Sequence, residues 1–146
     1  MPATISILPE ELLVEVFVYY WREDSTEDYS DHICRPELTL SHIDQRWRAI
    51  SIAIPRLWTR INRVVAQKCL EPIIAYLARS KHMPFDLVVL MRFNINMKKQ
   101  TPDDISEFCT VIQPHLHLLR KFEFRGYASQ AATGKLLRMM RHSCSL

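Results

Sequence analysis

Residues that could support catalysis or bind a metal are few in this chain. His115 and His117 flank Leu116 and could form a metal pair, but no carboxylate or thiol lies at ligand spacing beside them. The chain has only two glycines, Gly126 and Gly134, so it lacks a glycine-rich loop that could cradle a phosphate. We therefore expect no catalytic, cofactor-binding or metal-binding site, and we expect that the protein is not an enzyme.

The four cysteines are spread along the chain about 35 residues apart, and no two have the Cys-x-x-Cys spacing; they are Cys34, Cys69, Cys109 and Cys144. Such spacing is typical of separate reduced thiols rather than of a disulfide framework. Apolar runs such as residues 87–91 are far shorter than the roughly 18 residues that cross a bilayer. The first residues have neither the basic region nor the apolar core of a secretory signal. We expect a cytoplasmic or nuclear protein with no membrane partner.

Several arginines could attract an acidic partner; they are Arg46, Arg48, Arg56, Arg60 and Arg63. Such a cluster could neutralise phosphates, so a basic helical nucleic-acid-binding domain is one interpretation. Against it, the stretch from Trp21 to Glu37 holds six acids and two arginines, a net charge of −4. Trp47 also lies on the apolar side of the most basic predicted helix. We keep nucleic-acid binding as the alternative and do not expect a nucleic-acid partner.

Large apolar residues are concentrated in two segments, of which residues 8–17 are the first. This segment reads Leu-Pro-Glu-Glu-Leu-Leu-Val-Glu-Val-Phe. Pro9 suits a first helical turn, and the two acids after it lie at the positive end of the helix dipole. Apolar residues then recur at Leu12, Leu13, Val16, Phe17 and Tyr20. This spacing predicts an amphipathic helix with one apolar stripe.

The second apolar segment, residues 40–50, reads Leu-Ser-His-Ile-Asp-Gln-Arg-Trp-Arg-Ala-Ile. Leu40, Ile43, Trp47 and Ile50 fall at helical spacings, which predicts another short helix. Pro55 should end this helix and open a turn that returns Leu57 and Trp58 to the helical pair. Two short helices cannot hide this much apolar surface against each other, so we expect a partner. A self-contained three-helix core is the alternative.

These segments, together with Ala-Ile-Pro-Arg-Leu-Trp at residues 53–58, resemble the F-box, and the last of them is similar to the fungal branch of that family. The resemblance covers about residues 5–60. It implies an F-box protein that docks on a Skp-type adaptor and, through it, on the cullin of an SCF (cullin-RING) ubiquitin ligase. In that role the chain would be the substrate-recognition subunit, which presents a target protein for ubiquitination while other subunits supply the chemistry.

The same resemblance implies that apolar residues of both motifs contact the adaptor: Leu8, Pro9, Leu12, Leu13, Val16, Phe17, Leu40, Ile43 and Trp47. Two features depart from the family pattern. Asp44 replaces a cysteine that is usually buried, so this position should be either exposed or poorly packed. The stretch from Trp21 to Glu37 is longer than usual, and we expect it to loop out because the cost of loop closure rises slowly with length.

Residues 61–146 alternate between helical and strand patterns. We predict a helix over 70–78, a strand over 87–91, a helix beginning with Thr101 as its cap, a strand over 121–124 and a helix over 128–141. Strand centres near Arg60, Val89 and Glu123 lie about 29 and 34 residues apart, an interval typical of a solenoid.

The region resembles the irregular leucine-rich repeats (LRR) that often follow an F-box, with about two helix-strand units. Because it stops without a capping repeat, we expect this LRR-like region to be partial and the chain to be truncated or shortened. An independent small α+β domain is the alternative. The expected fold class is mainly α, with an α/β C-terminal part.

Overall fold

The computed structural model describes residues 7–23, 35–64, 69–91 and 102–126, together with Gly134 and Arg138. The chain divides into two compact units, Met1–Trp58 and Thr59–Leu146. The division falls next to the boundary that we predicted after residue 60, and each unit is described by itself. None of the described helices is both long enough and apolar enough to span a membrane.

The helical unit begins with α1, Glu10–Glu23. The carbonyl of Pro9 accepts a hydrogen bond from the Leu13 amide at 3.2 Å, so the helix starts where the sequence predicts. Leu13, Phe17 and Trp21 follow one another at four-residue intervals, and all three are buried. Because α1 extends to Glu23, the acidic stretch that we expected to loop out is partly helical, and its residues 24–34 lie outside the described part of the chain.

The single helix predicted over residues 40–50 is wrong, because the chain forms two helices there: α2, Pro36–Ser41, and α3, Gln45–Ala53. Asp44 separates them as the N-cap of α3. Its Oδ1 accepts a hydrogen bond from the Trp47 amide at 2.7 Å and satisfies an N–H that the first helical turn leaves unpaired. Asp44 is exposed, which is one of the two outcomes expected for an acid at this position.

The core of the helical unit is closed by aromatic rings. Phe17 of α1 packs against Trp47 of α3 with ring centroids 4.8 Å apart. A short 3₁₀ helix, Pro55–Trp58, returns Leu57 and Trp58 to the core as predicted, and both are fully buried. The indole nitrogen of Trp58 donates to the carbonyl of Ser51 at 2.9 Å, so the ring is fixed by a hydrogen bond as well as by packing.

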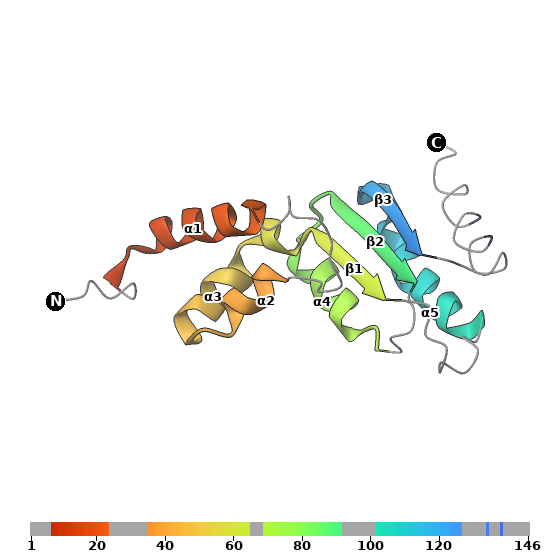
Figure 1. Cartoon of the computed structure of the whole chain (residues 1–146), viewed down its shortest axis with the longest axis horizontal. Coiled ribbons are helices and arrows are strands. Elements are labelled where there is room, and N and C mark those ends of the chain that lie inside the picture. Colours follow the sequence, from red (N-terminus) through yellow and green to blue (C-terminus); the bar gives the residue numbers. More distant parts are fainter. Residues whose placement is uncertain are drawn as a thin grey trace. The chain divides into compact units, whose positions relative to one another are not determined.

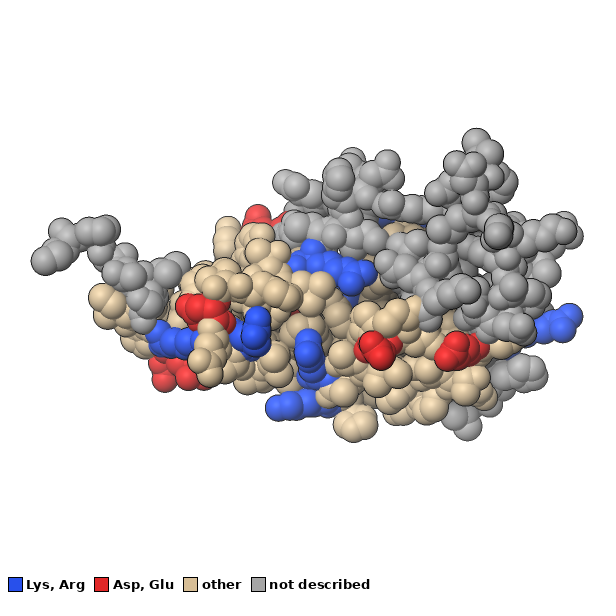
Figure 2. Space-filling view, turned by 90° about the horizontal axis from the view of Figure 1, so that it is seen from below, with Lys and Arg blue, Asp and Glu red and all other residues tan. Residues whose placement is uncertain are grey.

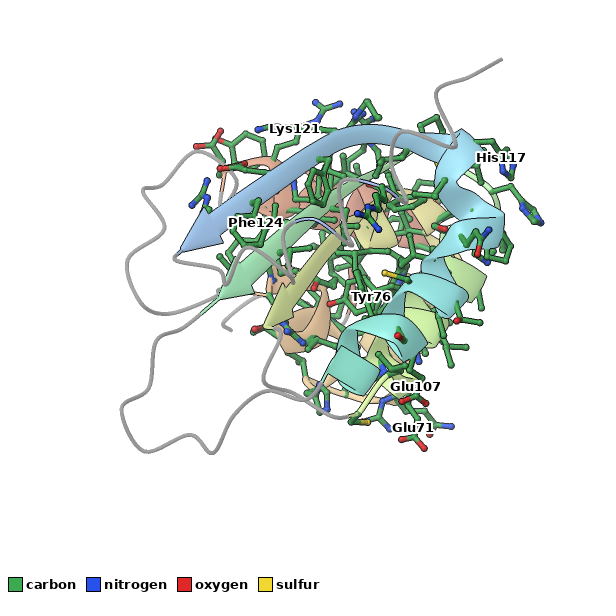
Figure 3. The ribbon with its side chains drawn as sticks, turned by 90° about the vertical axis from the view of Figure 1, so that its right-hand side faces the viewer. Glu71, Tyr76, Glu107, His117, Lys121 and Phe124 are labelled. Atoms are coloured by element: carbon green, nitrogen blue, oxygen red, sulfur yellow. The ribbon has the colours of Figure 1, made fainter. Side chains whose placement is uncertain are left out.

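The second unit contains a three-stranded parallel sheet in the order β1-β2-β3. Its elements in chain order are β1 (Arg60–Val64), α4 (Glu71–Arg79), β2 (Phe85–Met91), α5 (Pro102–Ile112), a 3₁₀ helix (Gln113–Leu118) and β3 (Leu119–Gly126). Figures 1 and 3 show α4 and α5 on the same side of the sheet. Two right-handed crossovers that advance one strand at a time place their helices in this way.

The helix-covered face of the sheet is apolar. Phe85, Leu87 and Val89 alternate along β2 and are fully buried, and Ile61 pairs with Leu87 in the register of β1 and β2. Tyr76 points from α4 toward the sheet, whereas exposed residues of both helices lie on the outside of the helical layer (Figure 3). This layer therefore holds the core of the second unit.

The other face of the sheet carries charged side chains. Arg120 forms a two-pronged ion pair with Asp86, at 2.8 and 2.9 Å. On β3, Glu123 accepts a hydrogen bond from Arg125 at 2.5 Å and lies 3.3 Å from Lys121. Lys121 and Phe124 appear on opposite sides of the β3 ribbon in Figure 3, as strand alternation requires. This side of the sheet thus carries charged residues at Asp86 and along β3, next to the buried Val88 of β2.

The predicted fold class, mainly α with an α/β C-terminal part, is confirmed at that level. The helix predicted over 70–78 and the strands over 87–91 and 121–124 are present, each within two residues of its predicted bounds. Thr101, predicted to cap α5, lies outside the described residues. So does most of the predicted helix over 128–141, in which only Gly134 and Arg138 are described, both as helical.

Candidate docking surface

The helix α1 carries a second apolar stripe that faces solvent. Leu12 is 52% exposed and Val16 is 44% exposed, and Tyr19 and Tyr20 continue the stripe at 65% and 40%. The apolar stripe predicted for this helix is therefore divided lengthwise: one part packs in the core, and the other part is uncovered among the described residues.

Helix geometry explains why two stripes arise. Consecutive residues differ by about 100° around the helix axis, so the neighbours Leu12 and Leu13 point in different directions. Leu13 and Phe17 occupy the core, which turns Leu12 and Val16 outward. Acidic residues flank the outer stripe, since Glu11 and Glu15 are both exposed. An exposed apolar stripe with a polar rim is typical of an interaction surface.

A further exposed apolar side chain, Ile43, lies in the turn between α2 and α3 and is 53% exposed. The N-terminal end of α3 is connected to the start of α1, because Nη2 of Arg46 donates a hydrogen bond to the carbonyl of Leu8 at 2.6 Å. We define the docking surface as Pro9, Leu12, Val16, Tyr19, Tyr20 and Ile43.

Arg48 makes a second hydrogen bond from a side chain to the backbone. Its Nε donates to the carbonyl of Ser41, the last residue of α2, at 2.9 Å. Arg46 and Arg48 were two of the five arginines considered for phosphate binding, and both are engaged with main-chain carbonyls. Figure 2 shows Lys and Arg side chains lying among uncharged and acidic side chains. Two of the five candidate arginines are thus already bound to the backbone of the helical unit.

The nine residues predicted to contact an adaptor fall into two groups. Leu13, Phe17, Leu40 and Trp47 are buried in the helical unit, and Leu8 is half-buried. The exposed members are Pro9, Leu12, Val16 and Ile43. The buried residues shape the surface from beneath, and the exposed ones are available for direct contact.

Two tyrosines of the docking surface, Tyr19 and Tyr20, were absent from the predicted contacts. The available signal was their spacing from Leu12, seven and eight residues along the same helix, which places them over Leu12 and Val16. The roles of Arg46 and Arg48 were also missed. No sequence pattern indicated them, because each donates to a backbone carbonyl rather than to a side chain.

The histidines and cysteines considered for chemistry form no candidate metal site among the described residues. His117 is exposed and His115 is half-buried. Burial lowers the pKa of His115, and the nearby positive charges of His117 and His82 lower it further. Within the described segments, no three His, Cys, Asp or Glu residues are grouped so that they could hold a metal ion. Cys69 and Cys109 are in the thiol form and not in a disulfide, whereas Cys34 and Cys144 lie outside the described residues.

Comparison of the chain with protein-family models, with curated proteins and with solved structures finds no match. The function must therefore be inferred from the residues and their geometry.

Proposed function

We propose that this chain is an F-box protein that binds a Skp-type adaptor through its helical unit. In this role it serves as the substrate-recognition subunit of an SCF (cullin-RING) ubiquitin ligase and presents a target protein for ubiquitination. The observation that carries the proposal is the docking surface: Leu12, Val16 and Ile43 stay about half exposed although the core beneath them is closed.

The closed core matters because it makes the exposed apolar residues surplus to folding. Leu13, Phe17 and Trp58 are fully buried without them. Full burial of a large apolar side chain stabilises by about 1.5–3 kcal/mol, and these residues have about half of that still to gain. A complex in which a partner covers several of these side chains at once is therefore stabilised by apolar burial that the free chain does not have.

The second unit would recruit the target. Three parallel strands in sequential order, with both crossover helices on one side, are compatible with the LRR-like units expected from the sequence. Parallel sheets are usually buried on both faces, yet the face opposite the helices carries Asp86, Lys121 and Glu123. The exposed charged side chains on this side of the sheet, such as Arg120 and Lys121, suit the recognition of a second protein.

Co-purification of the full chain with a Skp-type adaptor tests the proposal. Leu12→Asp and Ile43→Asp should each abolish the complex, because a charge on the docking surface would be buried without a partner. Both side chains are about half exposed, so the variants should remain folded. Ile74→Asp is the matched control, since Ile74 has the same 52% exposure as Leu12 but lies on α4 of the second unit.

The result expected is an adaptor complex with the parent chain and with Ile74→Asp, and none with the other two variants. Failure of the parent chain to bind would contradict the proposal. Equal loss with Ile74→Asp would show that the docking surface is not the binding site.

A further inference from the structure

We propose that Arg46 and Arg48 are positioning residues that hold the docking surface in its binding geometry before the partner arrives. This inference rests on the proposed function, because it concerns the same surface. It assigns the two arginines to the internal structure of the site rather than to contact with the adaptor.

Arg46 fixes the start of α1. Its Nη2 reaches the Leu8 carbonyl at 2.6 Å across 38 residues of sequence. Leu8 directly precedes Pro9, whose own carbonyl accepts the Leu13 amide in the first helical bond. The Arg46 guanidinium therefore connects the first turn of α3 to the segment just before α1. A hydrogen bond from a charged donor is stronger than one between neutral groups.

Arg48 fixes the turn that presents Ile43. Its Nε donates at 2.9 Å to the carbonyl of Ser41, two residues before Ile43. On the other side of the turn, Asp44 caps α3 through the Trp47 amide. Hydrogen bonds to α3 thus hold both ends of the turn, and they set the direction in which the Ile43 side chain points.

Trp47 stands between the two arginines and packs on Phe17, on the inner side of α1. Three consecutive residues of α3 therefore contact three parts of the helical unit. Arg46 bonds to the start of α1, Trp47 packs on the buried side of α1, and Arg48 bonds to the turn before α3. The spacing between Leu12 on α1 and Ile43 on the turn depends on these contacts. A partner that covers both residues then meets a preformed surface and avoids much of the entropic cost of ordering it.

The test compares Arg46→Met and Arg48→Met in the full chain, because Met keeps an apolar stem and removes the donors. Each variant should bind the Skp-type adaptor about three- to tenfold more weakly. Calorimetry should be run at a temperature at which unfolding curves show every variant folded, so that a loss of fold does not contribute. Arg46→Lys, which retains one charged donor, should recover part of the affinity.

Arg22→Met is the matched control. Arg22 is exposed near the end of α1, and its loss removes the same charge from the same unit without touching the Leu8 or Ser41 carbonyls. Its adaptor affinity should stay within about twofold of the parent chain. If Arg22→Met weakens binding as much as Arg46→Met, net charge rather than position governs the affinity, and the inference is overturned.

Hydrogen exchange in the free chain separates this inference from the proposed function. Arg46→Met should speed exchange of the Leu13 amide, which bonds to Pro9 at the start of α1, and Arg22→Met should not. Unchanged exchange in Arg46→Met overturns the positioning role whether or not an adaptor binds. A parent chain that does not bind the adaptor overturns the proposed function, and the exchange result then still decides the role of Arg46.

Discussion

Phe17 and Trp47 pack ring against ring, with centroids 4.8 Å apart and planes inclined by 46°. The contact joins α1 to α3 and encloses the core of the helical unit. Offset or tilted aromatic pairs add about 0.5–1.5 kcal/mol beyond the apolar area that they bury. Because this pair completes the core, the neighbouring Leu12 and Val16 are left for another role. The core and the docking surface are therefore separable by mutation.

Phe17→Ala should lower the free energy of unfolding of the helical unit by about 3–5 kcal/mol, because it opens a cavity in a closed core. Leu12→Ala should change it by no more than about 0.5 kcal/mol, since that side chain is half exposed. Chemical denaturation followed by circular dichroism measures both values. Similar losses for the two variants would contradict the division of α1 into an inner and an outer stripe.

Asp44→Ala should destabilise the helical unit by about 1 kcal/mol, because the Trp47 amide loses its acceptor at the N-terminus of α3. Asp44→Ser should retain most of the stability, since serine is also a good N-cap. Gln45→Ala, at the next exposed position, controls for a change in α3 that leaves the cap intact. The midpoints of chemical denaturation of the three variants, compared at an unchanged dependence on denaturant concentration, test this prediction. A serine variant that is destabilised as much as the alanine variant would exclude a capping role for Asp44.

The stability of the second unit should depend on pH through Glu123. The hydrogen bond from Arg125 lowers the pKa of this carboxyl, and Lys121 lowers it further. A carboxyl whose pKa is lower in the folded state stabilises at neutral pH, and this contribution is lost as the pH falls from its ordinary pKa through the lowered value. Glu123→Gln should therefore flatten the acid limb of the stability curve. Glu107→Gln, at an exposed position on α5, is the control for the loss of one carboxylate from the same unit.

His115 should make the stability of the second unit depend on pH in a higher pH range than Glu123 does. Its pKa is lowered by burial and by His117 and His82, so the folded state resists protonation more than the unfolded chain does. Stability should fall as the pH drops below the ordinary histidine pKa of about 6.5, because the unfolded state then binds the proton more readily. His115→Gln should remove this part of the loss. An NMR titration of the ring protons should also show His117→Gln raising the pKa of His115 toward its ordinary value.

Much of the second unit could be predicted because its signals are local. Pro72 stands at the start of α4, and Ile73 and Leu77 repeat at helical spacing, so the helix was placed within two residues. The continuous apolar run at residues 87–91 is typical of a strand in the middle of a parallel sheet, and β2 is that strand.

The helical unit was predicted less well because its decisive contacts are distant in sequence. Leu12 and Leu13 have the same chemistry and both repeat at helical spacing, so contacts with residues distant in sequence, such as that between Phe17 and Trp47, decide which of them enters the core. Asp44 had the spacing of a helix interior, and its capping role depends on a local backbone conformation that apolar periodicity does not report. The bond from Arg46 to Leu8 spans 38 residues and leaves no pattern at either end.

All three tryptophans of the chain, Trp21, Trp47 and Trp58, are buried in the helical unit, and the sequence places none after residue 58. Intrinsic fluorescence excited at the indole band therefore reports on one half of the protein only. Loss of the helical unit should shift that emission to longer wavelength, because unfolding exposes the buried indole rings to water. Intrinsic tryptophan fluorescence can therefore be used to follow the helical unit, which is the unit proposed to bind the adaptor.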